Sequence, residues 1–221
     1  MNKQRVPPRR AAAESFFDRA RARLRLDVPP ALTDPLAEGA RGDLDLNPSM
    51  WERAGVAATK PAAVLVPVID RDEPTVLFTV RTQELTSHAG QVAFPGGKID
   101  RADASPAAAA LREAKEEIGL GGAVIEPLGY LDLYLTFSGF RILPTVARVA
   151  PEFALVLNPW EVAETFEVPL SFLMTPANVQ RRSREWKGFD REYYAIPFGD
   201  RYIWGITAGI VRNLYDRVYA S

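Results

Sequence analysis

Three glutamates stand close together in the middle of the chain, at positions 113, 116 and 117. In a helix, residues three and four apart lie on one face, so the carboxylates of Glu113, Glu116 and Glu117 would share about one turn. Like charges at this spacing repel, and Arg112 offers only partial relief. Carboxylate oxygens without imidazole or thiolate suit a hard cation such as Mg²⁺ or Mn²⁺, which also takes phosphate oxygens. The spacing favours a metal site for a phosphate-bearing substrate, and a solvated acidic face is the alternative that it leaves open.

A glycine-containing segment, Phe94 to Lys98, precedes the acidic stretch. Paired glycines allow positive φ and a close approach of the backbone to a ligand, so Gly96 and Gly97 are candidates for substrate contact, although a plain turn needs the same residues. Arg81 and Lys98 could each contact a phosphate or pair with a carboxylate of the protein. We therefore expect this segment to face the substrate.

The helix that carries the glutamates has strong boundary signals. Ser105 is a good N-cap, Pro106 stands at the first helical position, and Gly119 is placed to end the helix. On both sides, short apolar runs bounded by turn residues predict strands. The predicted strands cover residues 62–69, 75–81, 124–135, 141–149, 179–186 and 192–196, with a turn at 136–139 and an amphipathic helix at 206–219. Strands mixed with two main helices predict an α/β sandwich.

The start of the chain differs in charge from the rest. Residues 1–25 carry eight Lys and Arg against two acids, whereas residues 26–221 carry nineteen against twenty-six. A helix over 11–26 would present Phe16, Phe17, Ala20 and Leu24 as one stripe, which we expect to dock on the body of the protein or on a second subunit. Residues 27–60 contain several prolines and no sustained period, and they predict an extended linker or wrap.

Composition excludes several classes of protein. The chain has 221 residues and no cysteine, so disulfides, thiolate metal sites and cysteine nucleophiles are excluded. Its longest apolar run, residues 62–69, is far shorter than the ~18 residues that cross a bilayer, and no signal-peptide core follows the basic start. We expect a cytoplasmic protein, with an organellar matrix as the alternative because the arginine-rich start is similar to a transit peptide.

The residues from Gly97 to Leu120 resemble the signature of the Nudix hydrolase family. The run from Arg112 to Leu120 matches every fixed position of the second half, Arg-Glu-apolar-any-Glu-Glu-any-Gly-apolar. The first half departs from the signature, because Asp103 replaces a glutamate and eight rather than seven residues separate it from Arg112.

A narrower resemblance points to the coenzyme A (CoA) pyrophosphatase branch of that family. It rests on residues 77–81, on Leu85 and His88, on the run from Gly90 to Gly97, and on the later Trp204 to Ala208. Thr82 and Thr86 depart from this branch, and the arginine usual at the second position could contact a phosphate. Taken alone, His88 would be a structural or surface residue, and its place in the signature implies contact with the substrate.

The resemblance implies an α/β/α sandwich with a mixed β-sheet over residues 56–221, preceded by an N-terminal helical extension over residues 1–55. It implies that Mg²⁺ or Mn²⁺ binds Glu116 and Glu117, and that Glu113 is a third ligand or positions the attacking water. Arg112 is expected to orient a carboxylate of the cluster. In many Nudix enzymes the final base lies outside the signature, on a later loop. We expect it here among Glu161, Glu164 and Glu167, with Glu164 preferred.

The implied reaction is hydrolysis of a diphosphate in a small nucleotide derivative, with CoA or acyl-CoA split into 3′,5′-ADP and 4′-phosphopantetheine. ADP-ribose, a dinucleotide or another nucleotide as substrate, or a nucleotide-sensing regulator without catalysis, are the alternatives. RNA is disfavoured because the body is acidic, and the run Arg181, Arg182 and Arg184 is expected to be a solvated face. The tryptophans 160, 186 and 204 fit either the core or stacking on a base. A homodimer is expected from the apolar N-terminal stripe.

Overall fold

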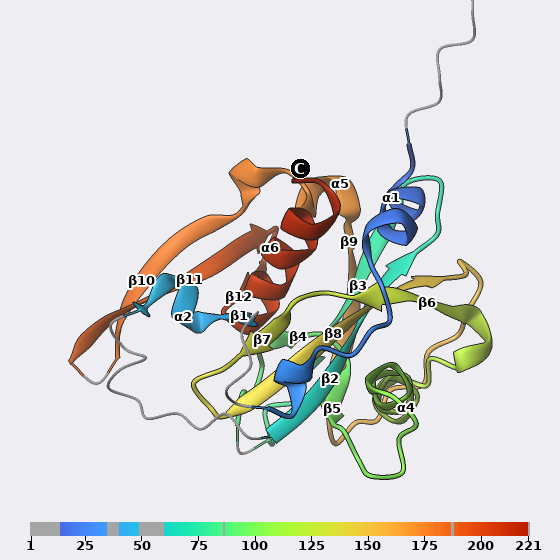
Figure 1. Cartoon of the computed structure of the whole chain (residues 1–221), viewed down its shortest axis with the longest axis horizontal. Helices are drawn as coiled ribbons and strands as arrows, with labels where there is room; N and C mark the ends of the chain where they lie inside the picture. Colours follow the sequence, from blue (N-terminus) through green and yellow to red (C-terminus); the bar gives the residue numbers. More distant parts are fainter. Residues whose placement is uncertain (1–13, 35–39, 49–59, 86, 187, 221) are drawn as a thin grey trace, which may run out of the picture.

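The computed structural model describes residues 14–34, 40–48, 60–85, 87–186 and 188–220 (Figure 1). Its larger helices are α1 (Phe16–Arg23), α4 (Pro106–Ile118) and α6 (Ile206–Val218), and its short ones are η1 (Pro30–Leu32), α2 (Asp43–Leu46), η2 (Gly122–Val124), α5 (Leu170–Leu173) and η3 (Pro176–Asn178). The strands are β1 (Ala40–Gly42), β2 (Lys60–Ile69), β3 (Thr75–Arg81), β4 (Val92–Ala93), β5 (Gly96–Lys98), β6 (Ile125–Tyr130), β7 (Leu133–Leu135), β8 (Phe140–Val149), β9 (Val162–Pro169), β10 (Gln180–Trp186), β11 (Phe189–Phe198) and β12 (Arg201–Trp204).

The centre of the fold is a mixed sheet in which β2 and β8 run parallel. Their register extends over all ten residues of each strand, from Lys60 opposite Phe140 to Ile69 opposite Val149. The predicted hairpin of β2 and β3 is paired only next to its turn, through Val68 and Ile69. The long partner of β3 is β9, and β2 also pairs with β5. The sheet therefore brings β5 and the start of β9, which are distant in sequence, to the same region as β3.

Helix α4 covers one face of this sheet. Its buried alanines, with Ile118, pack against Ala63, Leu65 and Leu77. The predicted caps are confirmed, because the Ser105 hydroxyl accepts a hydrogen bond from Ala108 N at 3.1 Å and Gly119 ends the helix in the left-handed conformation, with φ of 70°. The glutamates are therefore held on a helix whose other side is anchored in the core.

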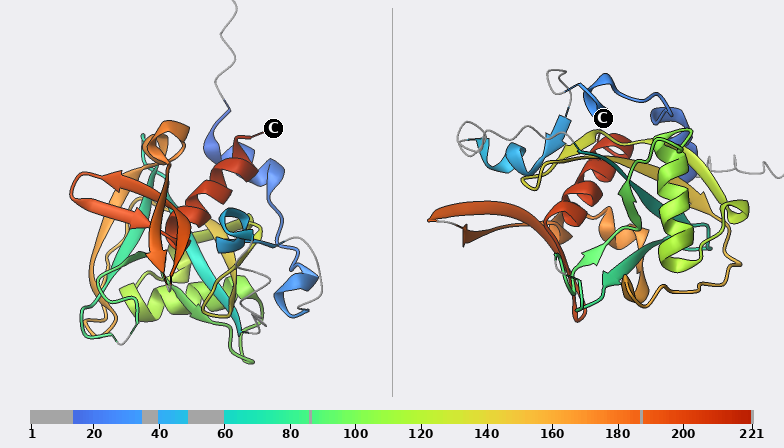
Figure 2. Two further views of the ribbon diagram at one scale, coloured as in Figure 1. Left: turned by 90° about the vertical axis from the view of Figure 1, so that its left-hand side faces the viewer. Right: turned by 90° about the horizontal axis from the view of Figure 1, so that it is seen from below.

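Helix α6 covers the opposite face. Its residues Ile210 and Leu214 pack in a second core with Val66, Val68 and Phe78, whose side chains alternate with those that face α4. Because helices cover both faces of a mixed sheet, the expected α/β sandwich is confirmed (Figures 1 and 2).

The N-terminal stripe docks on the body of the same chain. Phe16, Phe17, Ala20 and Leu24 are all buried in the core that contains α6. Helix α1 begins at Phe16 after the N-cap Ser15 and ends at Arg23, so it is shorter than the predicted 11–26, of which residues 11–13 lie outside the described residues. A homodimer stays a prediction, and the stripe no longer argues for one because α6 covers it.

The following segment extends along the body. Ala31 and Leu32 are buried, and β1 pairs in parallel with β7 at the edge of the sheet. Residues 35–39 and 49–59 lie outside the described part of the chain. The described part of residues 1–55 thus shares its core with the body, and the domain boundary at 55 stays a prediction.

Two strand predictions need correction. The stretch 124–135 is not one strand, because η2 occupies 122–124 and β6 ends at Tyr130, where the Tyr130 N–H donates to the Arg25 carbonyl at 2.8 Å. The strand predicted at 192–196 runs from Phe189 to Phe198, and with β10 and β12 it forms a second, three-stranded sheet. The turn at 136–139 is confirmed by the Gly139 N–H, which donates to the Thr136 carbonyl at 3.1 Å.

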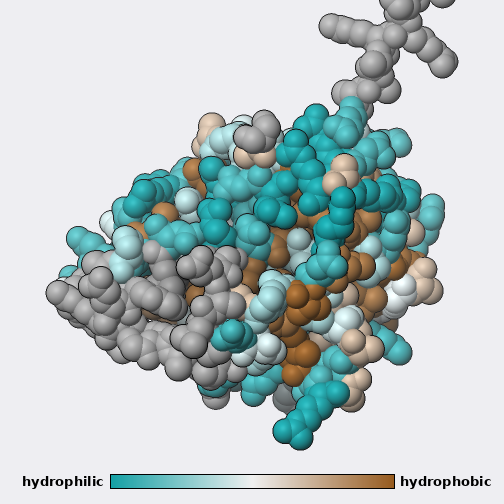
Figure 3. All heavy atoms as spheres, viewed as in Figure 1, coloured by the Kyte–Doolittle hydropathy of each residue, from teal (hydrophilic) through white to brown (hydrophobic). Residues whose placement is uncertain are grey.

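The described surface is mixed in hydropathy. In the view of Figure 3, hydrophilic residues dominate the described surface, and hydrophobic ones show mainly in a limited region. None of the helices in the described ranges is both long and apolar enough to cross a membrane.

Candidate active site

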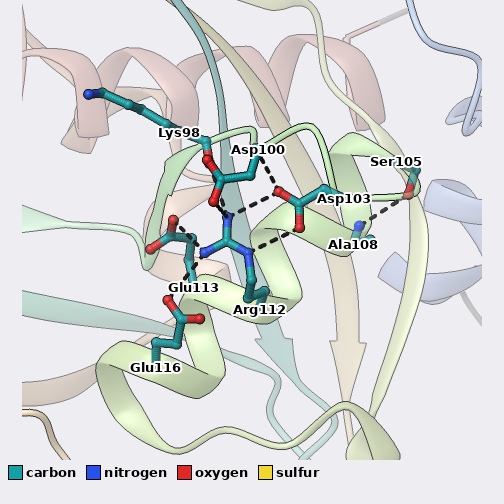
Figure 4. Close-up of polar contacts among 8 residues, drawn as sticks. All are labelled: Lys98, Asp100, Asp103, Ser105, Ala108, Arg112, Glu113 and Glu116. Atoms are coloured by element: carbon teal, nitrogen blue, oxygen red, sulfur yellow. Dashed lines mark hydrogen bonds and ion pairs between the residues drawn. The ribbon is translucent and has the colours of Figure 1, made fainter.

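Arg112 is the hub of the polar cluster on α4 (Figure 4). Its Nε donates to Asp103 at 3.0 Å, and one terminal nitrogen donates to Glu113 at 2.9 Å and to Glu116 at 3.2 Å. The other terminal nitrogen donates to Asp103 and to the Lys98 carbonyl, both at 3.1 Å. The carboxylates around it hold the pKa of the Arg112 guanidinium above its usual range. The expected role of Arg112 in orienting carboxylates is therefore consistent with its contacts.

Asp103, the departure from the family signature, is built into this cluster. Its side chain is only 7% exposed, and it also accepts the backbone N–H of Asp100 at 2.8 Å. The bidentate contact with Arg112 lowers the pKa of Asp103. The Asp103 N–H donates to the Asp100 carbonyl at 3.1 Å, which closes a turn. This turn brings the shorter side chain to Arg112 in spite of the longer spacing.

Glu117 is the most unusual carboxylate of the site. It is 4% exposed, and burial raises its pKa to about 8, with a further increase from the nearby charges of Glu161 and Glu113. Arg81 and a hydrogen bond from the Gly96 backbone lower the pKa and offset only part of this. A negative charge at Glu117 is therefore costly unless a cation lies beside it.

Glu113 packs directly on Gly97. A Cβ placed on residue 97 would lie 2.5 Å from a Glu113 carboxylate oxygen, so a larger residue there would require the Glu113 carboxylate to move. Burial raises the pKa of Glu113, while Arg112 opposes the shift. The close approach predicted for Gly97 is thus made to a carboxylate of the cluster.

The donor set and its charge fit a divalent cation. Glu113, Glu117 and Glu161 supply hard oxygen atoms, and the charges of Glu113 and Glu161 raise the pKa of the buried Glu117, which is a charge arrangement that a cation would balance. Within the described ranges, no three acidic or histidine side chains are already gathered as a coordination sphere. Arg112 hydrogen-bonds to oxygens of Glu113 and Glu116. These two carboxylates would have to turn toward the ion.

A pocket of about 340 Å³ has Arg81 and Gly96 in its lining and none of the carboxylates of the cluster. Arg81, His88 and Gly96, which were predicted to bind substrate, line it together with apolar side chains of β4 and α6. Two of these residues, Arg81 and Gly96, also act on Glu117. The pocket and the carboxylates therefore meet at Arg81 and Gly96.

Two residues that line the pocket have features typical of residues that contact a ligand. The Nε of Arg81 is buried and has no hydrogen-bond partner among the residues that the structure describes. His88 adopts the left-handed backbone conformation with φ of 57°, and its Nδ1 lies 3.0 Å from the Gln91 side-chain oxygen. Lys98 differs, because its side chain extends away from Arg112 and only its carbonyl contacts the cluster (Figure 4).

The preference for Glu164 as the base stays a prediction, and its contacts do not favour it. Glu164 lies opposite Val80 in the register of β3 and β9, and Val80 packs with the α6 core, on the face away from α4. On that face the Glu164 carboxylate accepts hydrogen bonds from two nitrogens of Arg201, and this ion pair lowers the pKa of Glu164. Glu167 pairs with Arg71 at 2.7 Å. Glu161, just before β9, is the acid of the three whose charge acts on Glu117 and Glu113.

Replacing Arg112 with lysine tests whether the hydrogen bonds of Arg112 hold the polar cluster together. Lysine keeps the charge but has one ammonium group, so it cannot bind Asp103 through two nitrogens and also reach Glu113. We expect Arg112→Lys to lower the free energy of unfolding by about 1–2 kcal/mol and to reduce activity. Urea unfolding measures the first effect. Arg101→Lys, at an exposed position, is the control, and equal stability of the two variants would contradict the hub role.

Comparisons with known proteins identify the family of this chain. Residues 59–188 match the NUDIX domain family. A Yersinia pestis (strain Pestoides F) protein named uncharacterized Nudix hydrolase NudL is 40% identical over 162 residues, which cover 73% of this chain and 81% of that protein. A Yersinia pseudotuberculosis (strain IP 31758) protein of the same name has the same identity and coverage.

Solved structures show weaker likenesses. A MutT/nudix family protein from Enterococcus faecalis has a TM-score of 0.46 and 17% identity, covering 71% of this chain and 61% of that one. DR0079 from Deinococcus radiodurans also has a TM-score of 0.46, with 13% identity over 70% of this chain and 83% of that one. The domain match spans more than half of the sequence and the Yersinia relatives share 40% of the aligned residues, so this chain belongs to the Nudix hydrolase family.

Proposed function

We propose that this protein is a Mg²⁺- or Mn²⁺-dependent diphosphatase acting on a small nucleotide derivative. The observation that carries the proposal is the buried carboxylate of Glu117, on which the charges of Glu113 and Glu161 act, beside a pocket that Arg81 and Gly96 join to it. A diphosphate needs its charge neutralised before water attacks, and such a set is suited to hold the cation for this purpose. Buried carboxylates without a cation would only cost stability.

Each residue has a role in this proposal. Glu116 and Glu117 are the first metal ligands, with Glu113 as a third ligand. When bound, the cation supplies Lewis-acid neutralisation of the diphosphate. Arg112 keeps the ligand side chains oriented through its contacts with Glu113 and Asp103. Glu161, in place of Glu164, accepts the proton of the attacking water at a carboxylate oxygen.

The proposed substrate is CoA or an acyl-CoA, with 3′,5′-ADP and (acyl-)4′-phosphopantetheine as products. The support is the CoA-branch signature, of which Val92, Phe94 and His88 all line the pocket. The apolar side chains of the pocket suit the uncharged arm of such a substrate, and Arg81 suits a phosphate.

Product analysis by mass spectrometry tests this function. The purified protein is incubated with Mg²⁺ or Mn²⁺ and, in separate reactions, with CoA, ADP-ribose, NADH and a nucleoside triphosphate. We expect 3′,5′-ADP and 4′-phosphopantetheine from CoA, ahead of turnover of the others, and no turnover with a chelator. Faster turnover of another diphosphate would replace CoA as the substrate and keep the reaction. No turnover with either metal would favour a nucleotide-binding regulator.

A further inference from the structure

The segment just before β9 forms a tight turn with the sequence Asn-Pro-Trp-Glu, residues 158–161. A proline favours the second position of a turn, and an asparagine before it can accept a hydrogen bond from the backbone two residues on. Both features are present, because the Asn158 side-chain oxygen accepts the Trp160 N–H at 3.2 Å and the Asn158 carbonyl accepts the Glu161 N–H at 3.0 Å. Local hydrogen bonds therefore fix the backbone of Glu161 relative to Asn158.

The same turn is attached to the end of α4. The last carbonyls of a helix have no partner within the helix and need donors from elsewhere. The Val156 N–H donates to the Ile118 carbonyl at 2.9 Å, and the Asn158 N–H donates to the Glu117 carbonyl at 2.8 Å. Asn158 is thus bound to the backbone of the residue that carries the buried carboxylate of the site.

The side chain of Asn158 also contacts the Glu161 carboxylate. Its amide nitrogen donates to Oε1 of Glu161 at 3.0 Å. The turn sets the orientation of this amide, because the amide oxygen accepts the Trp160 N–H and the NH₂ group is left for Glu161. Asn158 therefore links the end of α4, through its backbone, to the carboxylate of Glu161, through its side chain.

Glu161 is held from a second direction by the strand that leads to the pocket. The Thr82 N–H donates to the Glu161 carbonyl at 3.1 Å, and Thr82 directly follows Arg81, which lines the pocket. The charge of Glu161 acts on Glu117. A carboxylate that is fixed at its backbone and at one oxygen thus lies near the buried acid of the cluster.

We propose that Asn158 is a positioning residue for the reaction, which holds Oε1 of Glu161 and leaves Oε2 to accept the proton of the attacking water. The inference rests on the proposed function for the role of Glu161 as the base. A base acts only within hydrogen-bonding reach of the proton, and a misplacement of about 1 Å can cost about 10²-fold in rate. Because Asn158 also binds the end of α4, it fixes the base relative to the proposed metal ligand Glu117. Its neutral amide does so without adding a negative charge to the cluster.

Asn158→Asp tests this role with a nearly isosteric change. Aspartate keeps the oxygen that accepts the Trp160 N–H, so the turn is preserved, but a negative oxygen replaces the NH₂ donor and repels Glu161. We expect steady-state kinetics with CoA and saturating Mg²⁺ to show a kcat about tenfold lower and a KM within about twofold. In the Glu161→Gln background the same substitution should change kcat by less than about twofold, because the base is already absent.

Asn178→Asp is the matched control. The Asn178 side-chain amide also donates a hydrogen bond, to the Phe172 carbonyl at 2.9 Å, and it lies in η3, beyond the opposite end of β9. We expect this variant to keep kcat in both backgrounds. An unchanged kcat in Asn158→Asp, or an equal loss with and without Glu161→Gln, would overturn the positioning role, because a purely structural effect does not depend on the base.

The failure of this inference differs from the failure of the proposed function. If Glu161→Gln itself keeps kcat, Glu161 is not the base and the inference falls, while the diphosphatase reaction stands. If the unaltered protein hydrolyses no diphosphate, the proposed function fails, and melting temperatures decide whether Asn158 holds Glu161. We expect Asn158→Asp to lower the melting temperature by about 3–6 °C, and by less than about 1 °C in the Glu161→Gln background, where the glutamine amide can donate to the aspartate. Equal shifts in both backgrounds would overturn the inference.

Discussion

Replacing Glu117 with glutamine is expected to abolish metal-dependent turnover, by about 10³-fold or more, and at the same time to stabilise the metal-free protein. The loss of activity follows because the amide is a poorer ligand for a hard cation. The stabilisation follows because the substitution removes a 4% exposed carboxylate that repels Glu113 and Glu161. We expect the melting temperature without metal to rise by about 5 °C.

The stabilisation should depend on pH. The folded state raises the pKa of Glu117 from 4.5 to about 8, so it favours the protonated form. Protonated Glu117 therefore makes its full contribution to the free energy of unfolding below about pH 4.5, and this contribution is lost as the pH rises through 8. Glutamine does not titrate, and the difference in melting temperature between Glu117→Gln and the unaltered protein should widen over this range. A constant difference would contradict the burial of a titrating carboxylate.

Glu116→Gln separates the two effects of the first variant. Glu116 is also a proposed ligand, but its side chain is 56% exposed. We expect this variant to lose activity without a comparable gain in stability. Millimolar Mg²⁺ should raise the melting temperature of the unaltered protein more than that of either variant. An equal shift in all three proteins would exclude these glutamates as ligands.

Glu161→Gln is expected to reduce kcat by about 10²-fold or more, while Glu164→Gln should leave kcat within about threefold. Glu161 acts on Glu117 and Glu113, whereas Glu164 is paired with Arg201 on the other side of the sheet. Steady-state kinetics with saturating metal measures both variants. The two substitutions remove the same charge from positions three residues apart, so each is the control for the other.

The opposite ranking would restore Glu164 as the base. A large loss in Glu164→Gln with little change in Glu161→Gln would mean that the Arg201 pair opens during catalysis. Equal, small effects in both would move the base to Glu113, which lies in the same cluster. A thermal unfolding curve for each variant excludes misfolding as the cause.

The sequence was sufficient for features that depend on local interactions. The bounds of α4 follow from Ser105, Pro106 and Gly119, since capping acts between residues a few positions apart. The spacing of Glu113, Glu116 and Glu117 places them on neighbouring turns of any helix. The stripe of Phe16, Phe17, Ala20 and Leu24 was recognisable for the same reason, although its docking partner was not.

The tertiary structure decided what depends on pairing between distant segments. The three acids after Pro159 are equivalent in sequence, but the register of β9 on β3 turns Glu164 toward the α6 core and leaves Glu161 near Glu117. Likewise, strand alternation places Arg181 and Arg184 on opposite faces, and the register of β10 on β11 decides which residues each one meets. The local spacing of residues therefore indicated the family and the helix that carries the proposed metal ligands, whereas strand register decided which acid lies near Glu117. The physical reason is that a shift of one residue in a strand moves a side chain to the other face of the sheet, and no local signal records that choice.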